Sequence, residues 1–324
     1  MNLEWENQGR VGLDGWMGVI NSYKNNKAPK LQYLDISFSN TCNLNCVMCS
    51  SEYSTSWIRH DSEFLKGQAD FRKEVQPFLH KTQVEKNFST QLLEFSPQLQ
   101  RIIIKGGEPL ADPNCLDFLD QLPGSGFSGD LWITTNGTLL QDKVLEVLSR
   151  LKSLNLTLSI DGVEQVYEWI RGVAFSRVAE GLRKACELNN IKMVKVAFTA
   201  SAYNLWNIPS FMSWDQQMKG KYKKYEGASF INYVYQDYIR GQNIPRQDRL
   251  QVIEKIDKYF ADLYQPEELK NLFVYLGKAE YPIEKRCPFF QWTDFCNKMR
   301  DLDIYDCEPR LRELREEFFA TTEK

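Results

Sequence analysis

The chain has 324 residues, a length suited to one large α/β unit or two smaller domains. Its composition, 43% hydrophobic and 26% charged, is that of a globular protein and excludes wholesale disorder, collagen and coiled coil. Forty basic and 43 acidic side chains give a net charge of −3, so there is no global electrostatic case for binding nucleic acid or an anionic membrane.

The cysteine content and the hydropathy pattern indicate the compartment. No apolar run is long enough to span a bilayer, and the first residues lack the basic and apolar pattern of a secretory signal. We therefore expect a cytoplasmic protein with no membrane association. Its eight cysteines are too few for a disulfide scaffold and are expected to be reduced. With two histidines in all, any metal site must rest mainly on cysteine.

Short apolar runs alternate with longer amphipathic ones along the first two thirds of the chain. The apolar runs predict strands over residues 31–37, 101–105, 130–135, 155–160, 193–199 and 230–235. The amphipathic runs predict helices over residues 116–122, 141–154, 175–189 and 208–218. This alternation predicts right-handed βαβ units, and so an α/β fold with a parallel sheet or partial barrel.

The pattern changes after the sixth predicted strand. Helices are predicted over residues 248–263 and 308–319, and Pro-bearing turns join the segments between them. We therefore divide the chain into a lead segment (1–30), a barrel (31–240) and a mainly helical C-terminal extension (241–324).

Three cysteines follow the first predicted strand within eight residues: Cys42, Cys46 and Cys49. This spacing lets one loop wrap three thiolates around a compact metal centre. Tetrahedral zinc requires a fourth ligand, and no Cys or His follows at the distance typical of zinc fingers. A [4Fe–4S] cluster bound by three thiolates would keep one iron open to a small molecule.

Cys42-x3-Cys46-x2-Cys49 after a first strand resembles the signature of the radical S-adenosylmethionine (SAM) superfamily, although Met48 stands where an aromatic residue is common. The resemblance implies a partial (βα)6 barrel with a [4Fe–4S] cluster whose open iron binds the amino and carboxylate groups of SAM. It also implies reductive cleavage of SAM to methionine and a 5′-deoxyadenosyl radical, which abstracts hydrogen from a substrate.

The end of the second strand carries Gly106, Gly107, Glu108 and Pro109. Two glycines let backbone groups approach a ligand closely, and the carboxylate can accept from an ammonium group. A tight turn with a solvated Glu is the alternative. The motif resembles the superfamily's Gly-Gly-Glu-Pro segment, which implies binding of the SAM amino group.

Four later residues are candidates by the same resemblance. Asn136, at the end of the third strand, is expected to line the cofactor cleft. Strand alternation predicts that Ser159 and Asp161 point the same way. The resemblance implies a hydrogen bond from Ser159 to SAM and contact of Asp161 with substrate or ribose. Arg171 is expected to pair with the SAM carboxylate, although an exposed helix arginine remains the alternative.

The C-terminal extension holds Cys287, Cys296 and Cys307, and its order of elements resembles the twitch/SPASM-type group. An auxiliary cluster there is less expected than structural thiols, because the spacing departs from that group's tight pairs.

We expect a radical SAM enzyme that takes electrons from a donor such as flavodoxin or ferredoxin. A peptide substrate is favoured by resemblance to twitch-bearing relatives. RNA or a small molecule remains the alternative. The basic run at residues 219–225 could contact RNA or an acidic leader peptide, although a solvated loop before the sixth strand is the more expected structure. A non-catalytic iron–sulfur or zinc-binding module is the competing class.

Overall fold

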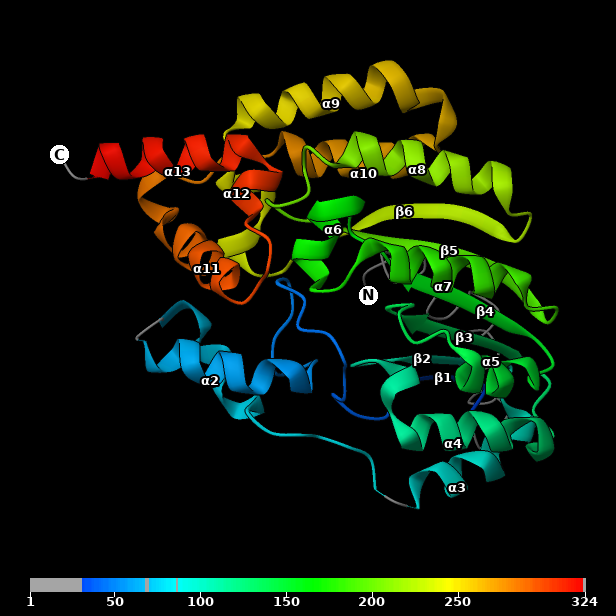
Figure 1. Ribbon diagram of the computed structural model, residues 1–324. Coiled ribbons are helices and arrows are strands. Elements are labelled where there is room, and N and C mark those ends of the chain that lie inside the picture. Colours follow the sequence, from blue (N-terminus) through cyan, green and yellow to red (C-terminus); the bar gives the residue numbers. More distant parts are fainter. Residues whose placement is uncertain (1–30, 68–69, 86, 323–324) are drawn as a thin grey trace, which may run out of the picture.

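The computed structural model describes residues 31–67, 70–85 and 87–322, so the predicted lead segment lies outside the described residues. Its strands are β1 (Tyr33–Ser37), β2 (Arg101–Lys105), β3 (Asp130–Thr135), β4 (Leu154–Ser159), β5 (Ile191–Ala200) and β6 (Tyr225–Tyr233). They form one sheet in the order β1 to β6, and every neighbouring pair is parallel (Figure 1). The predicted α/β class, a partial (βα)6 barrel with a mainly helical C-terminal region, is confirmed.

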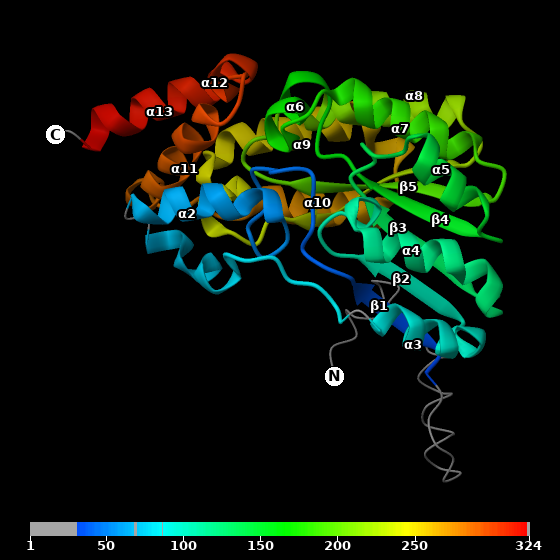
Figure 2. The ribbon, with the colours of Figure 1, turned by 60° about the horizontal axis from the view of Figure 1, so that its bottom comes forward.

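The helices divide into three groups around the sheet (Figures 1 and 2). Those that accompany the sheet are α3 (Phe88–Phe95), α4 (Pro113–Gln121), α5 (Asp142–Ser149), α6 (Glu164–Arg171), α7 (Phe175–Glu187) and α8 (Ile208–Lys221). Two follow β6: α9 (Arg246–Phe260) and α10 (Pro266–Gly277). The last group lies together at one end of the molecule: α2 (Ile58–Lys66), α11 (Cys287–Lys298), α12 (Ile304–Cys307) and α13 (Pro309–Thr322). No described helix has the length and apolar character needed to cross a membrane.

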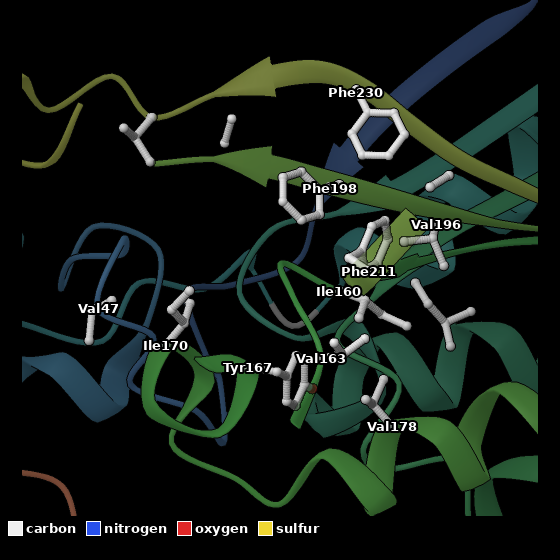
Figure 3. Packing of buried hydrophobic residues seen from close by; sticks show 14 of the residues in the cluster. Val47, Ile160, Val163, Tyr167, Ile170, Val178, Val196, Phe198, Phe211 and Phe230 are labelled. Atoms are coloured by element: carbon white, nitrogen blue, oxygen red, sulfur yellow. The ribbon is translucent and has the colours of Figure 1, made fainter. Parts of the chain in front are cut away.

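Strand alternation separates an apolar face of the sheet from a more polar one. On β5, Val196 and Phe198 are fully buried against the helices. Lys195 points to the opposite face of the sheet; its register partners are Thr157 on β4 and Gly227 on β6. The Phe198 ring lies 4.7 Å from that of Phe211 on α8 and 5.3 Å from that of Phe230 on β6 (Figure 3). The apolar face thus supplies the core, and the opposite face is left to line a cavity.

Several predicted bounds differ from those observed; the strand expected over residues 230–235, for example, is β6 (Tyr225–Tyr233). The helix expected over residues 141–154 ends at Ser149. Asn190 Nδ2 donates to the carbonyls of Leu148 and Leu151, both at 2.8 Å, and so satisfies groups at the helix end, while Leu154 already belongs to β4. The basic run at 219–225, expected as a loop, contains the end of α8 and the start of β6.

Candidate active site

A cavity of about 1510 Å³ extends along the inner face of the sheet. Its wall combines the cysteine loop, inward-facing residues of β2 to β6 and residues 263–281 of the C-terminal extension. Small-molecule sites usually occupy roughly 300–1,000 Å³, so this cavity has room for a cofactor and a second molecule together.

Cys42, Cys46 and Cys49 all border one end of this cavity. Burial, together with the negative charge of Cys46, raises the pKa of Cys42 to about 12. The same causes raise the pKa of Cys49. Thiolates at these positions therefore require compensating positive charge, which a metal centre supplies when it binds.

The donor set fits a cluster better than a single metal ion. Among the described residues, no three His, Cys, Asp or Glu side chains converge on a point that could hold one ion. In a [4Fe–4S] cluster each thiolate binds a different iron, so the sulfurs need not converge. The described part of the cavity wall contains no histidine, and its carboxylate, Glu226, belongs to β6. The residues thus fit a cluster held by three thiolates.

The backbone of the cysteine loop is held in place by side chains from distant segments. Their donors bind carbonyl oxygens as follows: Arg300 Nη2 to Asn45 (2.7 Å), Trp57 Nε1 to Cys46 (2.8 Å), Trp292 Nε1 to Val47 (3.1 Å) and Arg72 Nη2 to Cys49 (2.8 Å). Arg300 and Trp292 come from the C-terminal extension, which therefore braces the loop. Sequence reasoning missed all four, because no local motif marks them.

Arg72 is buried beside the end of the cysteine loop. Its side chain is only 1% exposed, and its guanidinium packs against the rings of Trp57 and Trp292, 5.0 and 4.1 Å from their centroids. These two rings stack on each other, with centroids 5.2 Å apart. Its Nε donates to Asp61 Oδ1 at 2.7 Å, and Asp61 Oδ2 accepts from the backbone N–H of Ser51 at 2.7 Å. A buried ion pair therefore anchors the end of the cysteine loop.

The Gly-Gly segment after β2 passes directly beneath the cysteine loop. Gly106 has φ +123°, and a Cβ there would lie 1.8 Å from Ser37 Oγ. A Cβ on Gly107 would lie 2.3 Å from the carbonyl oxygen of Thr41. Both glycines border the cavity, and Glu108 N–H donates to the same Thr41 oxygen at 2.7 Å. Only glycine permits this close approach.

Glu108 turns its carboxylate away from the cavity. It is 1% exposed and accepts from Thr135 Oγ1 (2.7 Å), Asn136 N (2.6 Å) and Leu110 N (3.0 Å). Burial raises the pKa of this carboxyl, and the three hydrogen bonds counteract that rise. Pro109 next to it is also buried. The alternative of a solvated Glu108 is therefore wrong. At this point the wall of the cavity is formed by Gly106 and Gly107.

Asn136 joins the end of β3 to the cysteine loop. Its Nδ2 donates to Asn43 Oδ1 at 2.9 Å, and its Oδ1 accepts from the N–H of Thr138 at 2.9 Å. The residue borders the cavity, close to the cysteine end.

Ser159 and Asp161 do not point the same way. Ser159 borders the cavity, whereas Asp161 is fully buried, accepts from Thr199 N–H at 2.8 Å and forms an ion pair with Arg171. Because β4 ends at Ser159, strand alternation does not extend to residue 161. Burial raises the pKa of Asp161, and the Arg171 guanidinium acts against that rise. Arg171 also borders the cavity, with its Nη1 3.6 Å from Cys46 Sγ, so the exposed-arginine alternative is wrong.

The C-terminal cysteines lie apart from this site. Cys287 and Cys296 both belong to α11, nine residues apart, which separates them by about 13 Å along the helix axis. Cys307 lies on α12, and Cys296 is fully buried. This arrangement does not suit one compact cluster.

Comparison with known proteins defines the class. The profile of the Radical SAM superfamily matches residues 36–200. A GTP 3′,8-cyclase of Rhodopirellula baltica is 32% identical over 155 residues, 48% of this chain and 38% of that protein. A GTP 3′,8-cyclase of Campylobacter jejuni subsp. doylei is 23% identical over 273 residues, 84% of this chain and 77% of that protein.

A solved structure has a similar fold. A histidine-tagged anSMEcpe with bound AdoMet superposes with a TM-score of 0.51 at 14% identity, over 74% of this chain and 62% of that one. The chain described here belongs to the radical SAM superfamily and is an enzyme. Membership implies a [4Fe–4S] cluster, SAM and a source of reducing electrons.

Proposed function

We propose that Cys42, Cys46 and Cys49 hold the [4Fe–4S] cluster and that the adjoining cavity holds SAM and the substrate. When bound and reduced, the cluster would supply the electron for reductive cleavage of SAM to methionine and a 5′-deoxyadenosyl radical, and that radical would abstract hydrogen from the substrate. The observation that carries the proposal is the placement of three thiols and the Gly-Gly backbone at one end of a large cavity.

The other candidate residues are proposed to act in two ways. The backbone of Gly106 and Gly107, the Asn136 and Ser159 side chains and the Arg171 guanidinium border the cavity and are available to contact SAM. Three candidate residues are buried behind that wall: Glu108, Pro109 and Asp161. Glu108 positions Asn136 through a hydrogen bond, and Asp161 positions Arg171 through an ion pair.

Substrate, subgroup, electron donor and compartment remain part of the proposal. The twitch/SPASM-type resemblance favours a peptide, whereas the relatives named GTP 3′,8-cyclase favour a nucleotide. A flavodoxin or ferredoxin in the cytoplasm is the expected donor.

Anaerobic reconstitution tests the cluster assignment. Wild-type protein should bind about four irons with absorbance near ~400 nm, and SAM should change the electron paramagnetic resonance spectrum of the reduced cluster. Alanine at Cys42, Cys46 and Cys49 together should abolish loading, whereas Cys307→Ala, a partly exposed thiol outside the site, should load normally. Wild-type iron content in the triple variant would overturn the assignment.

A substitution at the cavity wall tests SAM binding separately. Arg171→Gln removes a charged contact that borders the cavity, so SAM affinity should fall about 10- to 100-fold. Unchanged SAM affinity with full iron loading would remove Arg171 from the SAM site.

A further inference from the structure

The cavity wall is cationic although the chain as a whole carries a net charge of −3. Of the wall residues that the structure describes, Glu226 alone is acidic. Away from the cysteine end, the wall holds basic side chains at Arg101, Lys105, Lys195, Lys219, Arg240 and Lys278. A cleft lined by one sign of charge concentrates ligands of the opposite sign. Carboxylates outside the wall pair with Arg101 (Asp130), Lys105 (Asp35) and Arg240 (Asp237), so the case for an anionic ligand depends on Lys195 and Lys219.

Two of these lysines approach the same point of the sheet from different elements. Lys195 on β5 is the register partner of Gly227 on β6. Lys219 reaches Gly227 from α8: a Cβ on Gly227 would lie 1.9 Å from Lys219 Cε and 2.5 Å from its Nζ. Gly227 has φ +108° and no side chain, so the Lys219 side chain can occupy this space and border the cavity.

The acidic neighbours leave donors of both ammonium groups available. Lys195 Nζ lies 3.5 Å from Glu226 Oε2, and these two side chains are 42% and 48% exposed. Such an exposed pair contributes little stability and is readily exchanged for another anion. Each ammonium group has three N–H donors, so one carboxylate contact does not exhaust it.

The carboxylate beside Lys219 is shared with other donors. Asp215 lies 3.4 Å from Lys219 Nζ and is fully buried. It also accepts from the hydroxyls of Tyr225 and Tyr264, the latter at 2.8 Å. Because these hydroxyls already satisfy much of the carboxylate, Lys219 retains donors that can serve a ligand.

We propose that this end of the cavity binds a phosphoryl group, and that the substrate is a small phosphorylated molecule. Lys195 and Lys219 supply two cations. Two hydroxyl residues also border the cavity nearby: Thr157 is the register partner of Lys195 on β4, and Ser229 lies two residues after Gly227 on β6. Several donors around one point suit the several oxygens of a phosphoryl group. The proposal rests on the proposed function, because it assigns the substrate class for the same cavity.

Calorimetry on the reconstituted, SAM-loaded enzyme tests this site, with inorganic tripolyphosphate as the probe under anaerobic conditions. We expect saturable one-to-one binding that weakens as salt is raised. Lys195→Gln and Lys219→Gln should each weaken binding about 10- to 100-fold, whereas Lys195→Arg should retain it. Lys192→Gln is the matched control, because Lys192 is on the same strand but is 58% exposed and outside the wall; binding should be unchanged.

Three results would overturn the proposal: no tripolyphosphate binding by the wild type, equal weakening by Lys192→Gln, or tighter binding of hexaglutamate than of tripolyphosphate. The last result would assign the site to an acidic peptide. Thermal unfolding of each variant shows whether a loss of binding is due to misfolding. If Lys195→Gln misfolds, the affinity of Lys195→Arg for tripolyphosphate is the deciding measurement, and weak binding by a folded Lys195→Arg would count against the site. The assay requires no SAM cleavage, so its failure is distinguishable from failure of the proposed function.

Discussion

Replacing Arg72 with methionine should strongly destabilise the protein, because it leaves a buried carboxylate without its cation. Asp61 is fully buried and receives the Arg72 Nε–H at 2.7 Å. Removing one partner of a buried ion pair costs about 3–5 kcal/mol. The guanidinium also lies 4.1 Å from the Trp292 ring centroid, a contact worth up to about 2 kcal/mol when desolvated. Methionine recovers part of the packing, so we expect a loss of about 4 kcal/mol in the free energy of unfolding.

Urea denaturation followed by tryptophan fluorescence measures this loss. The double variant Arg72→Met with Asp61→Asn should recover about 2 kcal/mol relative to Arg72→Met, because it no longer buries an unpaired charge. Arg59→Met is the control: Arg59 is 85% exposed and pairs with Glu63 on the surface, so its loss should cost less than about 1 kcal/mol. Cluster loading of Arg72→Met should also fall, because the Cys49 carbonyl loses its donor.

A loss below about 1 kcal/mol for Arg72→Met would refute this reasoning. So would a double variant no more stable than the single one, since the unpaired carboxylate would then not be the cause of the loss.

Two further substitutions have matched controls. Gly107→Ala should lose most of its cluster loading, measured as iron per chain, because the added Cβ would lie 2.3 Å from the Thr41 carbonyl oxygen. Gly124→Ala is the control: Gly124 has open space around it, so this variant should load normally. Equal loading of the two variants would contradict the prediction. Burial raises the pKa of Glu308 from 4.5 to about 7, so the folded state binds more protons and stability should fall as pH rises between these values. Glu308→Gln should reduce this loss of stability by up to about 3 kcal/mol, which a comparison of melting temperatures at pH 5 and pH 8 would show. Exposed Glu316→Gln is the control and should leave the pH dependence of the wild type unchanged. The same pH dependence in the wild type and in Glu308→Gln would contradict the prediction.

Local pattern was sufficient for much of the sheet and for the motifs at its edge. The bounds predicted for β2 and β3 match those observed, since apolar, β-branched runs with polar ends mark them clearly. The Cys42–Cys49 spacing and the Gly-Gly segment were equally local, and the strand order brings them to one cavity end.

Long-range contacts could not be predicted in this way. The donors to the cysteine loop come from as far as 255 residues away, as Arg300 does for Asn45, and nothing near Arg300 in the sequence indicates that partner. Lys219 belonged to a basic run that is typical of a solvated loop. Its position in the cavity depends on Gly227 in the next strand, a relation visible only once α8 and β6 are packed together.

The release of 5′-deoxyadenosine tests the central claim most directly. Reconstituted enzyme, SAM and dithionite are incubated anaerobically, and the products are separated by chromatography. The account predicts equal amounts of 5′-deoxyadenosine and methionine from the wild type and from Cys307→Ala, and neither product from Cys46→Ala. A wild-type enzyme with a fully loaded, reducible cluster and bound SAM that released no 5′-deoxyadenosine would contradict it.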